Sequence, residues 1–148
     1  MINKNRATLE IYVDGGSRGN PGPAASGYVI SAGKKFIKED GGYLGEATNN
    51  VAEYTAVLLA LKKIKALYGK EKIQDMSFRF FSDSLLMVNQ MNGIYKIEDE
   101  RLQKLFIEIW NLKIDFGPIT FTHVPREKNK EADAMVNKIL DQEGSRLF

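Results

Sequence analysis

Two aspartates stand at positions where their carboxylates can meet. Asp14 ends a segment of alternating apolar and polar residues and is followed by two glycines, and Asp83 ends a short apolar segment that is followed by a helical pattern. If these segments are parallel neighbouring strands, both carboxylates meet at the carboxyl edge of a sheet, where open α/β sheets hold their sites. Taken singly, each aspartate is better explained as a turn or helix-capping residue. The two aspartates are therefore candidates for a common site only if their strands are parallel neighbours.

Glu53 is the third acid at a position that requires an explanation. On a helix over residues 51–67 it falls on the apolar side, and the opposite side carries Lys62 and Lys65. A glutamate that faces a core needs a partner or a metal ion. The alternative is a capping box, in which Asn50 caps the helix and Glu53 reaches back to it from the third position. The sequence leaves both interpretations open.

Asp133 completes a set of four candidate ligands. It opens a helix predicted over residues 131–140, where an acid also simply suits the helix dipole, and alone that interpretation is preferred. Carboxylates are hard donors that favour Mg²⁺ or Mn²⁺ over zinc or copper. Two such ions, roughly 3.5–4 Å apart, support in-line displacement at a phosphodiester. The chain has no cysteine and one histidine, His123, which excludes disulfides, thiolate zinc sites and histidine-rich metal sites.

The elements that must position these acids follow from periodicity and turn signals. A Gly/Pro-rich turn is predicted over residues 15–23, and Gly33-Lys34 is predicted to form a hairpin turn. The resulting order is three strands, a helix, a strand, two helices, a strand and a helix, which predicts an α/β fold with a mixed sheet and helices on its faces. The strands are predicted over residues 8–14, 27–31, 35–38, 77–82 and 119–124, and the helices over residues 51–67, 84–91, 98–113 and 131–140.

Composition limits the classes of function. The 148 residues suit one domain, residues 1–148, and carry a net charge of only +2, which does not by itself indicate a nucleic-acid-binding protein. No apolar run reaches the roughly 18 residues of a membrane span. The polar segment Met1–Arg6 is not followed by an apolar stretch, so we expect no secretory signal and a cytoplasmic location. Trp110 is expected in the core, on the helix over residues 98–113.

The neighbours of the four acids form motifs that occur in family order. Their spacing resembles type 1 ribonuclease H over residues 8–140, and most closely its bacterial and archaeal branch that lacks a basic handle. The motifs are Tyr12–Pro23 around Asp14, Thr48–Glu53, Phe81–Ser84 around Asp83, and a run from His123 to Asp133 in which these two residues are ten positions apart.

The resemblance implies a ribonuclease H-like fold, with a five-stranded mixed sheet whose first three strands are antiparallel. It implies an endonuclease that cuts the RNA strand of RNA–DNA hybrids and leaves 5′-phosphate and 3′-hydroxyl ends. Asp14, Glu53, Asp83 and Asp133 would hold two Mg²⁺ ions, for which Mn²⁺ can substitute. Asp14 would bridge both ions, Asp133 would help hold the ion on the nucleophile side, and Glu53 and Asp83 would hold the other. His123 would assist proton transfer or product release from a mobile loop; its ordinary alternative is a half-exposed histidine at a strand end.

The same resemblance implies how the substrate is held. Gly15, Ser17, Asn20, Asn49 and Asn50 would line the minor groove of the hybrid, where the 2′-hydroxyls of RNA are read. An amide side chain suits a hydroxyl because it both donates and accepts hydrogen bonds. Double-stranded RNA is a second candidate substrate, and a monomer without membrane or obligate protein partners is expected.

Two features depart from many members of the family. Residues 92–104 contain three basic and three acidic side chains, so they form no cationic handle, and Leu85 replaces the usual glutamine. Both changes weaken the expected hybrid binding, and neither affects the metal ligands. A binding module that has lost catalysis is disfavoured by the presence of all four acids. A strand-transfer enzyme of the same fold is disfavoured by the motif Thr48–Glu53 and by His123.

Overall fold

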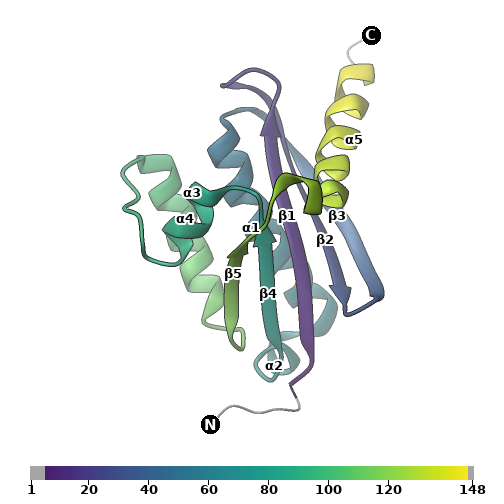
Figure 1. The fold of residues 1–148 in the computed structure, drawn as a ribbon, viewed down its shortest axis with the longest axis vertical. Helices are drawn as coiled ribbons and strands as arrows, with labels where there is room; N and C mark the ends of the chain where they lie inside the picture. Colours follow the sequence, from purple (N-terminus) through teal and green to yellow (C-terminus); the bar gives the residue numbers. More distant parts are fainter. Residues whose placement is uncertain (1–5, 147–148) are drawn as a thin grey trace.

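Five strands form one mixed sheet in the order β3-β2-β1-β4-β5 (Figure 1). The computed structural model describes residues 6–146. The expectation that Met1–Arg6 begins no secretory signal therefore lies outside the described residues for all of this segment but Arg6. β2 runs antiparallel to both β1 and β3. β4 runs parallel to β1, and β5 runs parallel to β4. This confirms the predicted fold class. The strands are β1 (Thr8–Ser17), β2 (Gly22–Ala32), β3 (Lys35–Ala47), β4 (Ser77–Ser82) and β5 (Ile119–His123).

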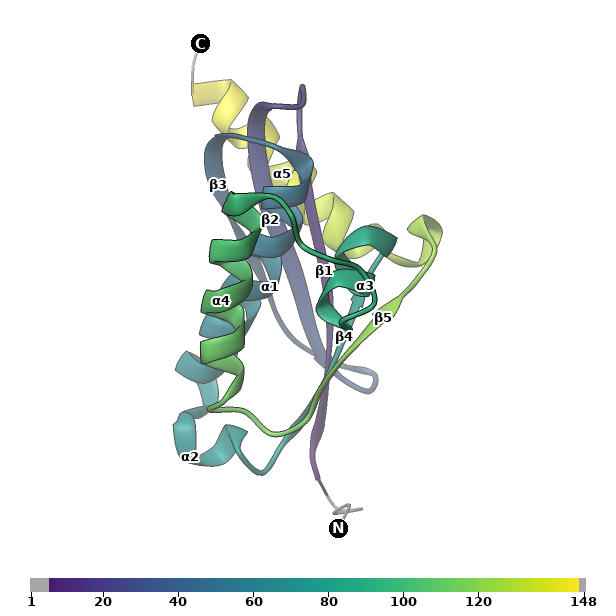
Figure 2. The same cartoon turned by 90° about the vertical axis from the view of Figure 1, so that its left-hand side faces the viewer.

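Helices cover both faces of this sheet. α1 and α4 pack on one face, and α5 packs on the opposite face over β1, β2 and β3 (Figures 1 and 2). Within the described part of the chain, no helix has both the length and the apolar character that crossing a membrane requires. The helices are α1 (Asn49–Tyr68), α2 (Lys70–Ile73), α3 (Leu85–Met91), α4 (Glu100–Lys113) and α5 (Lys130–Arg146), and a short 3₁₀ turn, η1 (Arg126–Lys128), precedes α5.

The main core lies between the sheet and α1. The alternation of β1 points Leu9, Ile11 and Val13 toward this layer, where they meet Leu61 and Ile64 of α1. Each fully buried aliphatic side chain of this kind stabilises the fold by about 1.5–3 kcal/mol. The alternation therefore assigns Tyr12 to the opposite face of the sheet, the face that α5 covers only in part.

The structure corrects several predicted boundaries. β1 continues through Ser17, because residues 15–17 pair with residues 24–26 of β2, and the predicted turn over residues 15–23 shrinks to residues 18–21. Thr48, and not Asn50, caps α1 by accepting a hydrogen bond from the Val51 amide. Trp110 is 55% exposed, so its placement in the core was wrong. The hairpin turn at Gly33-Lys34 is confirmed, with Gly33 at φ +61°.

Candidate active site

Three carboxylates converge where β1 and β4 end. The parallel register pairs Tyr12 with Phe81, so Asp14 and Asp83 each follow two residues later on neighbouring strands. Glu53 reaches the same point from α1, and one carboxylate oxygen from each of the three residues lies within 4.8 Å of the other two. Asp14 and Glu53 are buried, and Asp83 is partly exposed. The expected meeting of Asp14 and Asp83 at the carboxyl edge of the sheet is therefore observed.

A close approach of α1 to β1 brings Glu53 to Asp14. At Gly15 a Cβ atom would lie 2.2 Å from the carbonyl carbon of Ala52 and 2.3 Å from the amide nitrogen of Glu53. Only glycine leaves room for this contact. On the neighbouring strand the hydroxyl of Ser26 donates to the carbonyl oxygen of Ala52 at 2.6 Å, which holds the same turn of the helix against the sheet.

We expect Gly15→Ala to destabilise the protein and to disable the site. The added methyl collides with helix backbone, which cannot rotate away, so α1 must shift and move Glu53 relative to Asp14. Overpacking of this kind typically costs about 1–3 kcal/mol. Thermal unfolding and nuclease assays measure the two effects. Gly16→Ala is the matched control, because its Cβ would meet only the Val136 side chain at 3.5 Å; equal losses in both variants would contradict this account.

Glu53 does not form the capping box that the sequence left open. Because Thr48 is the cap, Glu53 lies beyond the third helical position, and its side chain turns to the carboxylate cluster. Its Oε2 atom is buried and has no hydrogen-bond partner among the described residues. A buried carboxylate oxygen without a partner is costly, so the site has an unmet requirement for a positive ligand.

The electrostatics of the cluster support the same conclusion. Burial, followed by the charges of Asp83 and Asp133, raises the pKa of Asp14 to about 8, although the Gly15 amide opposes this shift. Burial and then the charges of Asp14 and Asp83 raise the pKa of Glu53 well above its ordinary value. Converging carboxylates repel one another unless a cation or a proton intervenes. An all-oxygen donor set of this kind fits a hard divalent cation such as Mg²⁺ or Mn²⁺.

Asp133 joins this site from the opposite layer. It is not part of the 4.8 Å group, but it lines the same depression, which has a volume of about 480 Å³, from the first turn of α5. The side-chain amide of Asn137 donates to the Asp133 carboxylate at 3.4 Å and to its carbonyl at 3.2 Å. Arg18 and Arg126 also line the depression and supply positive charge at its edge.

Asn129 is a positioning residue that reasoning from single residues missed. Its side chain is fully buried, and its Nδ2 donates to the Val13 carbonyl at 2.9 Å, one residue before Asp14. Its own carbonyl accepts a hydrogen bond from the Asp133 amide at 3.1 Å. Asn129 thus links the strand that carries Asp14 to the helix that carries Asp133. The resemblance included Asn129 in a motif, but no periodicity in this irregular segment marks it as buried.

The predicted substrate-binding residues form a small network at the start of α1. The Ser17 amide donates to Asn49 Oδ1 at 2.9 Å, and the Asn49 amide donates to Asn20 Oδ1 at 3.1 Å. The Ser17 hydroxyl also donates to the Gly19 carbonyl. These bonds tie the turn between β1 and β2 to the helix. Gly15, Ser17 and Asn49 line the depression that contains the carboxylates, whereas the exposed Asn20 and Asn50 lie outside its lining.

His123 lies at the margin of the site. It ends β5, pairs in register with Ser82 of β4, and is exposed. The next residue, Val124, donates its amide to the Ser82 carbonyl at 2.9 Å, which places the chain after His123 beside the strand end that carries Asp83. His123 is not part of the lining of the depression in this structure.

Comparisons with known proteins agree with this geometry. A family model described as "Reverse transcriptase-like" matches residues 12–139. Ribonuclease HI of Halobacterium salinarum is 41% identical over 134 residues, which cover 90% of this chain and 64% of that protein. A bifunctional protein of Mycobacterium tuberculosis is 38% identical over 133 residues, which cover 88% of this chain and 35% of that protein. The chain thus spans 64% of the length of the first relative and 35% of the length of the second.

A solved structure extends the comparison to three dimensions. LC11-RNase H1, a protein isolated from compost and crystallised with an RNA/DNA hybrid, superposes with a TM-score of 0.86 at 41% identity, covering 91% of this chain and 98% of that one. The strand order, the helix layers and the acidic cluster define a ribonuclease H-like domain. The chain belongs to the ribonuclease H1 family.

Proposed function

We propose that this chain is an endonuclease that hydrolyses the RNA strand of RNA–DNA hybrids and leaves 5′-phosphate and 3′-hydroxyl ends. The observation that carries the proposal is the group of three carboxylates within 4.8 Å, in which a buried Glu53 oxygen has no partner. The relative crystallised with an RNA/DNA hybrid supports this substrate, since it shares the fold at a TM-score of 0.86.

Asp14, Glu53, Asp83 and Asp133 would hold two Mg²⁺ ions, for which Mn²⁺ can substitute. When bound, the ions supply an activated water and neutralise charge that develops on the phosphodiester. The protein's own contribution is to hold the carboxylates in place. The Gly15 amide opposes the rise in the pKa of both Asp14 and Glu53, and Asn129 links the strand that carries Asp14 to the helix that carries Asp133.

Asn49 is the residue best placed to recognise RNA. Its Oδ1 already accepts the Ser17 amide, which fixes the orientation of the side chain and leaves its NH₂ group for an oxygen of the substrate. A 2′-hydroxyl provides such an oxygen, and it is what distinguishes RNA from DNA. We therefore assign Asn49 the leading role among the predicted substrate-binding residues, with Ser17, Gly15, Asn20 and Asn50 around it.

The direct test is the cleavage of labelled RNA–DNA hybrid, double-stranded RNA and double-stranded DNA side by side. We expect Mg²⁺-dependent cleavage of the hybrid, no cleavage of DNA, and complete loss of activity in chelator. Cleavage of double-stranded RNA would add this second substrate. Binding of the hybrid without cleavage in Mg²⁺ or Mn²⁺ would favour the alternative function, a binding module of the same fold.

We expect His123→Ala to slow turnover without abolishing it. General acid–base assistance is typically worth about 10²- to 10⁴-fold, and a role restricted to product release would cost less. Because His123 is exposed and not part of the depression, no ligand of the metal site is lost with it. Cleavage rates over pH 6–9 provide the measurement, with His123→Gln as a second variant that cannot titrate. A rate unchanged at every pH would assign His123 a purely structural role.

The proposal treats residues 1–148 as one domain that acts as a monomer in the cytoplasm. In its support, the described strands form a single five-stranded sheet, and α1, α3 and α5 all pack on strands of this sheet. Light scattering coupled to gel filtration tests the oligomeric state, and a molecular mass of twice 16.7 kDa would contradict the monomer.

A further inference from the structure

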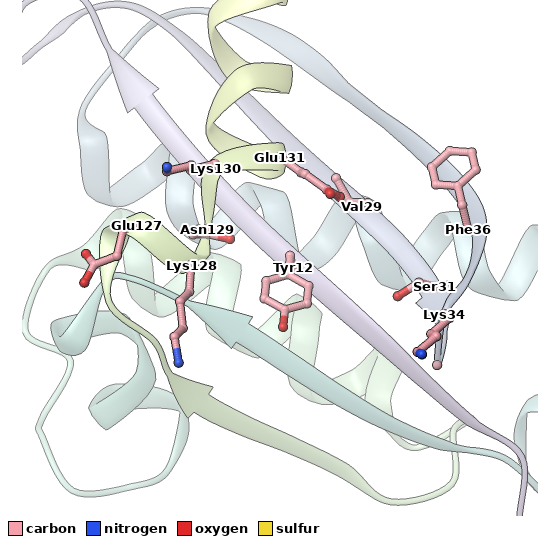
Figure 3. Close-up of a pocket in the computed structure, with 11 residues that line it drawn as sticks. Tyr12, Val29, Ser31, Lys34, Phe36, Glu127, Lys128, Asn129, Lys130 and Glu131 are labelled. Atoms are coloured by element: carbon pink, nitrogen blue, oxygen red, sulfur yellow. The ribbon is translucent and has the colours of Figure 1, made fainter.

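A second depression lies on the open part of the sheet face that carries α5 (Figure 3). It has a volume of about 440 Å³ and is bordered by β1, β2, the β2–β3 hairpin and the segment that joins η1 to α5. Pockets for small ligands typically measure about 300–1,000 Å³ and combine apolar walls with a few polar groups. None of the four candidate metal ligands lines this depression, so it is distinct from the active site.

An aromatic side chain forms the floor. Across the sheet, Tyr12 pairs with Phe81 of β4 on one side and with Val29 of β2 on the other. The rings of Tyr12 and Phe81 stack at 4.8 Å with an interplanar angle of 20°. Phe81 therefore covers one face of the Tyr12 ring, and Tyr12 borders the depression together with Val29. Phe36, 58% exposed, stands on the rim. Flat aromatic ligands stack on such surfaces.

Two ammonium groups flank this floor. Lys34 extends from the hairpin turn and Lys128 from η1, on opposite sides of the Tyr12 hydroxyl (Figure 3). Neither lysine forms an ion pair within residues 6–146. Two unpaired ammonium groups beside an aromatic floor are suited to hold a phosphate.

The wall on the α5 side offers acceptors instead. The Glu131 carboxylate lies near Val29 in Figure 3, and Asn129 has a buried Oδ1 atom without a partner among the described residues. Because Asn129 is fully buried, the acceptor that a ligand can reach on this wall is the exposed Glu131 carboxylate, which favours a ligand that brings donors. The site thus combines an aromatic floor, two lysines that flank its hydroxyl end, and the Glu131 carboxylate beyond its other end.

We propose that this depression binds a nucleoside monophosphate. The base lies against Tyr12 and Phe36, the phosphate lies between Lys34 and Lys128, and the donors of the base or ribose face the wall that carries Glu131. A simple anion would leave the aromatic floor and the acceptors unused, and a neutral aromatic ligand would leave both lysines unpaired. A nucleotide is the class of ligand that satisfies all three.

Titration of the full chain with adenosine 5′-monophosphate in chelator tests the proposal, with backbone amide chemical shifts as the readout. We expect saturable binding in the millimolar range or tighter, with shifts confined to residues 12, 29–36 and 127–131. Adenosine alone and inorganic phosphate alone should each bind at least several-fold more weakly. The double variant Lys34→Met/Lys128→Met should weaken binding at least tenfold, and Phe36→Ser should weaken it several-fold.

The control is Lys62→Met/Lys104→Met, which removes the same charge from exposed lysines on α1 and α4 and should leave the affinity unchanged. Any one of the following results would overturn the proposal. They are the absence of saturation up to about 10 mM nucleotide, ten times a millimolar dissociation constant, equal losses in both double variants, and shifts confined to the catalytic depression. Equal binding of phosphate and nucleotide would likewise reduce the site to an anion site and refute the nucleotide assignment.

Discussion

Replacement of Asp83 by Asn is expected to abolish cleavage of the RNA–DNA hybrid while the protein stays folded. Asp83 is the partly exposed member of the carboxylate group, and the backbone around it is held by independent bonds, such as the Ser84 amide to Ser82 Oγ at 3.0 Å. An amide keeps the shape of the side chain but removes the negative charge that a divalent cation requires. We expect turnover to fall at least about a thousandfold, which corresponds to roughly 4 kcal/mol of transition-state stabilisation.

The matched control for this variant is Asp75→Asn, which changes the same chemical group on an exposed turn before β4, outside the site. Single-turnover cleavage of labelled hybrid measures the chemical step, and filter binding in chelator measures the retained affinity. Asp83→Asn should bind the hybrid nearly as well as the wild type, because the substrate contacts proposed around Asn49 remain. Retention of more than about a tenth of the wild-type rate, a loss of only ~1.4 kcal/mol, would show that Asp83 is not a ligand.

The sheet and the convergence of its acids were predictable because they depend on periodicity and on chain order. Alternation in β1 assigned a face to each side chain, and a parallel β1–β4 pair necessarily brings Asp14 and Asp83 to one edge. Asp133 was recognisable only through its motif, since an acid in the first turn of a helix is ordinary by itself. Its place in the same depression depends on how α5 crosses the sheet, which no local pattern specifies.

Contacts between segments that are distant in the sequence could not be predicted from sequence patterns. Gly15 looked like the start of a turn, yet its missing side chain is what admits the α1 backbone. Asn50 and Thr48 are both good caps, and because Thr48 is the cap, Glu53 does not lie at the capping-box position. Trp110 lies next to the buried Ile109 on α4 but is itself 55% exposed. In each case tertiary packing decided between locally equivalent options.

Replacement of Asp14 by Asn should raise the melting temperature of the metal-free protein while it abolishes activity. Asp14 is buried among acids, and burial together with Asp83 and Asp133 raises its pKa from 3.8 to about 8. A neutral amide removes this repulsion, and stabilisation of about 0.5–2 kcal/mol is typical when a functional group of this kind is neutralised. Thermal unfolding of both proteins in chelator, and again in Mg²⁺, is the measurement.

The pH dependence of this gain follows from the raised pKa of Asp14. Between pH 4 and 8 the folded protein retains a proton that the unfolded chain releases, so the free energy of unfolding of the wild type falls as pH rises. The Asp14→Asn variant has no carboxyl group to titrate at this position. In chelator, the excess of its free energy of unfolding over that of the wild type should therefore be largest near pH 8 and should shrink toward pH 4. Mg²⁺ should reverse the order, because it stabilises the wild type by mass action and the variant much less. A variant that melts lower than the wild type in chelator at pH 8, with Mg²⁺ shifting both proteins equally, would show that the carboxylates do not act as one cation site.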